Sequence, residues 1–212
     1  MSTHILIPLE EKKYYHIYNR GNDGINLFYQ DRNYTYFLKK YDYYMSDYVD
    51  TFAYCLLPNH FHLLIQVKAK AEFLVRKDEF PQQDDMERMS AGEIVSELFR
   101  RFFMSFSKSI NIQENRTGSL FQKNFRRKLV SNESYFSSLI YYIHNQLKHH
   151  GFDHMDDRDY LWSSYSRFLI EKETKLRKKE VLNWFGGKSE FVKFHSVKQD
   201  LREINDLVIE QD

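Results

Sequence analysis

Apolar positions along this chain follow two different periods, and each change of period predicts a new element. Residues 14–19 are mainly aromatic or β-branched and lead into the turn formers of residues 20–24, a pattern typical of a strand that ends in a loop. Asp31 then stands at an N-cap position, and apolar residues follow it at spacings of three and four. This spacing predicts a helix over about residues 31–45.

The middle of the chain returns to strands and then to a helix. Residues 51–57 are almost wholly apolar and residues 60–67 largely so, with Pro58 and Asn59 between them. This arrangement predicts two strands joined by a tight turn. Apolar residues between 94 and 106 then repeat at helical spacing and form one broad face.

Two more elements complete the predicted core. Residues 120–130 follow a Thr-Gly-Ser break and are interpreted as a fourth strand. Ser131 or Asn132 is expected to cap a last core helix that runs to about His150, where Gly151 ends it.

The predicted order of elements is β-α-β-β-α-β-α. Its first six elements match the split βαβ arrangement of ferredoxin-like and RRM-like folds, an α+β class with an antiparallel sheet and helices on one face. We divide the chain into a core domain, residues 1–165, and a C-terminal helical appendage, residues 166–212. Within the core, residues 68–90 are acidic and poor in apolar side chains, which indicates an exposed insertion.

Composition adds limits on the class of protein. The 212 residues hold 31 Lys and Arg against 30 Asp and Glu, and the 42% share of hydrophobic residues excludes wholesale disorder. The single cysteine, Cys55, excludes an internal disulfide and a multi-cysteine zinc site. Neither a membrane-spanning segment nor a secretory signal is found, so we expect a cytoplasmic protein with no membrane partner.

Two histidines provide the first candidate chemistry. His60 and His62 are two residues apart in a predicted strand, so both imidazoles project to the same face while Phe61 projects to the other. This geometry suits two metal ligands. A chance His-x-His in a strand is the alternative, and the spacing alone favours that alternative.

The last predicted helix provides a second candidate site. Tyr142 and Gln146 are four residues apart, so they lie together on one flank of its apolar stripe, whereas Tyr141 and His144 lie on the other side. A tyrosine beside a divalent metal can serve as a nucleophile, and an amide oxygen one turn away can ligate Mg²⁺ or Mn²⁺. Without further context, Tyr142 is better explained as a packing residue.

Charge is distributed unevenly behind the net charge of +1. Residues 100–130 hold eight positive residues against one negative residue, a local net charge of +7, and phenylalanines are interleaved with them. Cations beside aromatic rings are typical of a nucleic-acid groove, where rings stack on unpaired bases. A solvated helix face followed by a sheet edge explains the pattern equally well.

Four ordered motifs together resemble the HUH motif family of single-domain tyrosine transposases, which includes the transposases associated with repetitive extragenic palindromes. Residues 57–64, LPNHFHLL, resemble the HUH motif itself. Residues 15–22, YHIYNRGN, resemble the family's first strand and the loop after it. Residues 118–125, GSLFQKNF, resemble the strand before the catalytic helix. Residues 142–144, YIH, stand at the family's catalytic tyrosine motif.

The resemblance implies a metal-dependent single-strand DNA endonuclease and strand transferase. Tyr142 would be the nucleophile that forms a 5′-phosphotyrosine link, and His60, His62 and Gln146 would hold Mg²⁺ or Mn²⁺. The implied partner is single-stranded or hairpin DNA. Two strand exchanges would need either two protomers or sequential use of one tyrosine, and relatives often dimerise. The candidate DNA-binding residues are Arg20, Asn22, Arg100, Arg101, Arg116, Lys123, Arg126, Arg127 and Lys128.

The sequence departs from the family after the tyrosine motif. Relatives often continue with Leu-Asn-Pro-Val, whereas residues 145–148 are NQLK, so the helix is free to continue toward His150. Gln146 still occupies the position where relatives place a Gln or Asn ligand. A domesticated protein that binds DNA or RNA hairpins without cutting them is the alternative function, and an unrelated α+β protein is the third.

Overall fold

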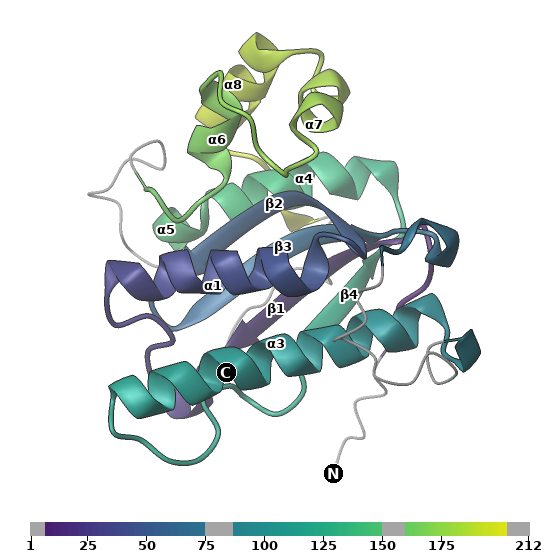
Figure 1. Cartoon of the computed structure of the whole chain (residues 1–212). Coiled ribbons are helices and arrows are strands. Elements are labelled where there is room, and N and C mark those ends of the chain that lie inside the picture. Colours follow the sequence, from purple (N-terminus) through teal and green to yellow (C-terminus); the bar gives the residue numbers. More distant parts are fainter. Residues whose placement is uncertain (1–6, 75–86, 150–159, 203–212) are drawn as a thin grey trace.

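The protein is a four-stranded antiparallel sheet with helices on both faces (Figure 1). The computed structural model describes residues 7–74, 87–149 and 160–202. The strands are β1 (Tyr14–Arg20), β2 (Val49–Leu57), β3 (His60–Val67) and β4 (Arg126–Val130). The longer helices are α1 (Asp31–Met45), α3 (Ala91–Gln113) and α4 (Glu133–His144). The shorter helices are α5 (Gln146–His149), α6 (Tyr165–Leu169), α7 (Lys178–Trp184), α8 (Lys188–Ser196) and the 3₁₀ turns Asn22–Gly24 and Lys70–Glu72.

The strands are ordered β2-β3-β1-β4, and each neighbouring pair is antiparallel. This is the order that the split βαβ arrangement requires, because α1 and α3 each carry the chain across the sheet. The predicted α+β fold class is therefore confirmed, but helices cover both faces of the sheet rather than one, because α4 packs on the face opposite α1 and α3.

Helices α1 and α3 cover one face of the sheet through an aromatic core. Phe37 of α1 meets Phe102 of α3 at 4.8 Å between ring centroids and Phe61 of β3 at 5.1 Å. All three side chains are fully buried. The helical repeat predicted over residues 94–106 is the face of α3 that packs here, and Ser90 starts that helix with a capping box to Glu93.

Helix α4 covers the opposite face, so neither face of the sheet is open (Figure 1). Leu139 and Ile143 of α4 pack in one cluster with Phe52 of β2 and Leu64 of β3. Burial on both faces explains why residues 51–57 are apolar at nearly every position rather than at alternate ones.

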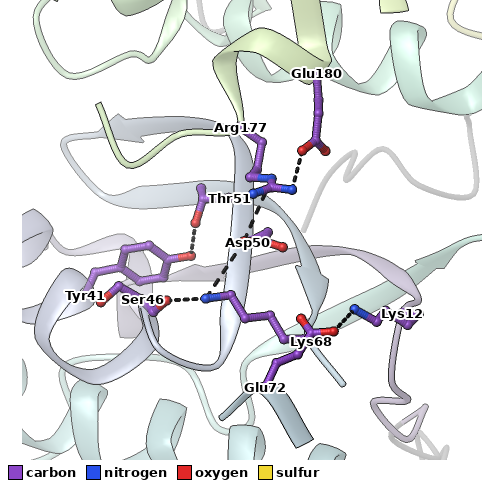
Figure 2. Close-up of polar contacts among 9 residues, drawn as sticks. All are labelled: Lys12, Tyr41, Ser46, Asp50, Thr51, Lys68, Glu72, Arg177 and Glu180. Carbon is purple, nitrogen blue, oxygen red and sulfur yellow. Dashed lines mark hydrogen bonds and ion pairs between the residues drawn. The ribbon is translucent and has the colours of Figure 1, made fainter. Parts of the chain in front are cut away.

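The appendage helices α6, α7 and α8 rest on α4 and on the edge of β2 (Figure 1). The backbone N–H of Arg177 donates to Thr51 on β2 at 2.9 Å. Figure 2 shows the Arg177 side chain between Glu180 and Asp50, the latter 4.0 Å away, while Lys68 reaches Asp50 from the other side at 3.9 Å. The division into a domain of residues 1–165 and an appendage stays a prediction.

The helix predicted over residues 31–45 is confirmed as α1, but one strand boundary, the continuity of one helix and one N-cap differ from the prediction. The fourth strand covers only Arg126–Val130, because Asn124 adopts φ of 60° and breaks the extended backbone before it. The helix that carries Tyr142 ends at His144 and resumes at Gln146, with Asn145 between the two segments. At the start of α1, Gln30 rather than Asp31 is the N-cap, in a reciprocal cap with Asn33.

Two other expectations concern residues outside the described ranges. Of the insertion predicted at residues 68–90, residues 75–86 lie outside the described ranges. Gly151, the predicted end of the last core helix, also lies outside them. Within the described part of the chain, no helix combines the length and apolar character that crossing a bilayer requires.

Candidate functional site

Strands β1 and β3 bring the candidate histidines to the face of the sheet that α4 covers. Directly opposite residues on neighbouring strands share a face, and Tyr18 is opposite His62 while Arg20 is opposite His60. The prediction that His60 and His62 project together is confirmed, since their ring centroids are 5.2 Å apart and Phe61 is buried on the other face.

Each of these two histidines is held through its Nδ1 atom. His60 Nδ1 lies 2.7 Å from the Asn59 side-chain oxygen in the turn. His62 Nδ1 lies 3.0 Å from Nε2 of His16 on β1, and the His16 and His62 rings are stacked with centroids 5.2 Å apart. His16 is fully buried and His62 is 2% exposed. The Nε2 side of each candidate ligand is therefore the side available for other chemistry.

Tyr142 lies against this histidine cluster within the same chain. Its ring meets the His62 ring edge-on at 5.6 Å and the His16 ring at 6.0 Å. The side chain is 3% exposed. Tyr142 and His62 are therefore in contact within one chain, which the sequence left open.

Gln146 lies one turn after the tyrosine and is fully buried. Its side-chain Nε2 donates to the backbone oxygen of Tyr142 at 3.1 Å, which fixes the amide orientation. Asn145 closes the preceding turn, because its backbone N–H and its side-chain Nδ2 each donate to the Tyr141 oxygen at 2.9 Å. Gln146 is therefore oriented by the end of α4 itself.

The donor atoms at this site fit a cation. Among the buried side-chain atoms of the described residues, His60 Nε2, His62 Nε2 and Gln146 Oε1 have no hydrogen-bond partner. A buried acceptor that lacks a donor is destabilising, and a cation would compensate for it. No cluster of three or more His, Cys, Asp or Glu side chains suits a metal in the described ranges. The fit therefore depends on the amide oxygen as the third ligand.

His16 and Tyr18 are site residues that the sequence motifs did not single out. Both project to the site face from β1, where the Tyr18 ring stacks on that of His62 at 6.2 Å. Burial raises the pKa of Tyr18, and the positive charge of Arg126 and its hydrogen bond to the tyrosine oppose that rise. The alternation of residues 14–19 was the available signal, because it places residues 16 and 18 on one face.

The predicted DNA-binding residues do not gather on one face. Arg20 at the end of β1 is on the site face, and so are Arg126 and Lys128 of β4, which are opposite Tyr18 and His16. Arg127 is directed to the other face, where its Nη1 donates to Ser96 of α3 at 2.7 Å. The positive residues of β4 are therefore divided between the two faces of the sheet.

The remaining predicted DNA-binding residues lie on α3, in a 3₁₀ turn or in loops. Arg100 and Arg101 project from α3, on the opposite face of the sheet, and both bond to Glu97, whose pKa the Arg100 and Arg101 hydrogen bonds lower to about 2. Arg116 donates to Asn111 at 2.9 Å, and Asn22 donates to Asp23 at 3.1 Å. Lys123 is exposed in the loop before β4.

A second buried histidine pair connects α4 to the appendage. His195 of α8 donates from Nδ1 to the Phe191 oxygen at 2.8 Å, so its Nε2 accepts from Nδ1 of His144 at 3.0 Å. His144 Nε2 in turn lies 2.8 Å from the Ser164 hydroxyl. Burial lowers the pKa of His195 to about 4 and the pKa of His144 well below its usual value. Both rings are neutral at pH 7.

Comparison with known proteins supports the fold. No protein-family model matches the sequence, and no curated protein shows significant similarity to it. A solved structure of a REP-associated tyrosine transposase bound to a REP hairpin is similar, with a TM-score of 0.58 at 14% identity. The similarity covers 81% of this chain and 87% of the transposase chain. At this identity, the comparison shows that the two proteins share a fold.

Proposed function

We propose that this protein is a metal-dependent single-strand DNA endonuclease and strand transferase with Tyr142 as its nucleophile. The observation that carries the proposal is the ring contact of the buried Tyr142 with His62 in a single chain, with the buried Gln146 bonded to the Tyr142 backbone oxygen. The fold shared with a tyrosine transposase supports it.

His60, His62 and Gln146 would hold Mg²⁺ or Mn²⁺ through two Nε2 atoms and Oε1. When bound, the cation would polarise the scissile phosphate and stabilise the negative charge that develops on it. The Asn59 contact and the His16 contact orient the two imidazoles from their Nδ1 side. Gln146 is oriented by its bond to the Tyr142 backbone.

Tyr142 would act on a phosphodiester in line with its hydroxyl. The phenolic oxygen forms a bond to phosphorus while the bond from phosphorus to the 3′-oxygen breaks. The phenolic proton passes to water, and the departing oxygen takes a proton to become a free 3′-hydroxyl. One ester replaces another, so a different 3′-hydroxyl can reverse the step without an external energy source. The ring contact with His62 favours use of the tyrosine by its own chain.

The DNA backbone would follow the positive side chains that share the site face. Arg20 and Arg126 are exposed there, and Lys128 is opposite His16 on β4. These cations would neutralise phosphates on either side of the scissile bond. A homodimer remains part of the proposal as the assembly in which two strands could be exchanged.

The test is covalent capture of a hairpin-bearing single strand in Mg²⁺ or Mn²⁺. A 3′-end label should become linked to the protein, while a 5′-end label should be released with a free 3′-hydroxyl. Tyr142→Phe should abolish the link and retain hairpin binding. Tyr141→Phe is the matched control, because this neighbouring tyrosine contacts the His195 ring instead. A link that persists in the Tyr142→Phe protein would exclude Tyr142 as the nucleophile.

The low exposure of Tyr142, 3%, favours a second candidate, a hairpin-binding protein that does not cut. Such a protein would bind DNA or RNA hairpins through its arginines and lysines, and a chelator would leave that binding unchanged. Wild-type protein that binds hairpins tightly but gives no covalent link in either metal would establish this candidate instead.

A further inference from the structure

We propose that His16 is a positioning residue that fixes the tautomer of His62 and so prepares Nε2 of His62 for a divalent cation. The inference rests on the proposed function, because it concerns the same site. It starts from one contact, the 3.0 Å separation of His16 Nε2 and His62 Nδ1.

A proton count on this contact leaves two arrangements. One proton lies between the two nitrogens, and it belongs either to His62 Nδ1 or to His16 Nε2. If His62 carries it, the neutral His62 ring has a lone pair on Nε2 and can ligate a metal. If His16 carries it, Nδ1 of His62 is an acceptor and the ring proton is on Nε2, where it blocks ligation. Metal binding through Nε2 therefore requires that His16 accept the hydrogen bond.

The direction of the contact excludes His16 itself as a ligand of the same cation. It meets His62 on the Nδ1 side of the ring, whereas the proposed ligand atom is Nε2 on the other side. Metal-binding histidines usually donate this second N–H to a carboxylate or a carbonyl oxygen, which can only accept. His16, by contrast, can accept the His62 Nδ1 proton only in the neutral tautomer that has its own proton on Nδ1.

The fold holds His16 rigidly in this place. It lies in β1, which is hydrogen-bonded to β3 on one side and to β4 on the other, and its side chain is fully buried. The Tyr18 and Tyr142 rings lie 4.9 Å and 6.0 Å from the His16 ring. His16 thus contacts both the proposed ligand and the proposed nucleophile.

Two substitutions separate hydrogen bonding from packing. His16→Gln keeps an oxygen acceptor for His62 Nδ1, whereas His16→Phe keeps a ring but removes the acceptor. Mn²⁺ affinity is measured by titration calorimetry without DNA, together with the thermal midpoint of the metal-free protein. His195→Phe is the control, because it replaces a buried histidine of the other pair.

We expect His16→Phe to weaken Mn²⁺ binding about 10-fold to 100-fold, and His16→Gln to weaken it by less than about 3-fold. The His195→Phe protein should bind Mn²⁺ like the wild type below its thermal midpoint. In ¹⁵N ring spectra with Mg²⁺, His62 should carry its proton on Nδ1 in the wild type.

The outcomes distinguish this inference from the proposed function. If the wild type binds Mn²⁺ and links to DNA but His16→Phe binds Mn²⁺ equally well, the role of His16 is disproved and the proposed function stands. If His16→Phe and His16→Gln weaken Mn²⁺ binding equally, His16 has a packing role only, and the proposed role in fixing the His62 tautomer is disproved. If folded wild-type protein binds no Mn²⁺, both proposals fail together.

Discussion

Two buried histidine pairs flank helix α4, and in each pair two ring nitrogens lie 3.0 Å apart. In the pair His144–His195, the outer nitrogens are also satisfied, by the Ser164 hydroxyl and the Phe191 oxygen. In the pair His16–His62, the outer nitrogen of His62 is a buried atom with no hydrogen bond to the described residues, and Gln146 Oε1 is another.

A buried histidine pair is therefore not by itself evidence of a functional site. Both ring nitrogens of His144 and of His195 are hydrogen-bonded, so these side chains have a structural role, the attachment of α8 to α4. Buried lone pairs without donors are destabilising unless a ligand supplies the missing interaction. The pair with the incomplete hydrogen bonds is therefore the better candidate for chemistry, although the side chains of both pairs are buried.

The largest expected effect comes from removing one histidine of each pair. If the proposed function holds, His62→Ala should reduce formation of the DNA link by about 100-fold or more, because it removes a ligand of the cation that would stabilise transition-state charge. His195→Ala should instead lower the free energy of unfolding by about 2–4 kcal/mol through lost packing and hydrogen bonds. Rates of covalent capture and urea unfolding curves measure the two effects. Equal effects of both substitutions on both measurements would contradict the comparison.

The dependence of stability on pH should arise from the structural pair. His195 has a pKa of about 4 in the folded protein, below the ordinary 6.5 that applies to the unfolded chain. Between these values the unfolded chain binds a proton that the folded protein does not, so the free energy of unfolding rises with pH. Its contribution, up to about 3 kcal/mol, is fully present above pH 6.5 and is lost as the pH falls to about 4.

Urea unfolding between pH 4 and pH 7 measures this effect. The His195→Phe protein should show a shallower slope over that window, since only His144 of the pair still titrates. A slope equal to that of the wild type would show that the pH dependence arises elsewhere.

The smallest expected effect concerns Gln146. Gln146→Met removes the buried Oε1 atom, which is stabilising, and the hydrogen bond to the Tyr142 oxygen, which is destabilising. Because the first effect is the larger, we expect the free energy of unfolding to rise by up to about 1 kcal/mol. Mn²⁺ affinity should fall. Asn145→Leu is the matched control: its amide is bonded to Tyr141 and Lys148, so the same kind of change should destabilise the protein. Destabilisation by both substitutions would argue against an unmet acceptor at Gln146.

Much of the fold follows from local periods in the sequence. The face of α3 and the β2–β3 hairpin were predicted from spacing alone, because each element must bury its own apolar side chains. The predicted strand at residues 120–130 was too long, since Asn124 interrupts extended backbone without a glycine or proline to announce it. At the interruption, the Asn145 side chain donates to the Tyr141 backbone oxygen, a contact that no period reveals.

For the site, the sequence by itself determined which residues share a face within one element: His60 with His62, and Tyr142 with Gln146. Only the tertiary structure decided that β1 places His16 beside His62, and that Arg126 and Lys128 share the histidine face while Arg127 contacts α3. The physical reason is that alternation along a strand is a local property. Strand register and the choice of covering helix depend on contacts between residues far apart in the chain.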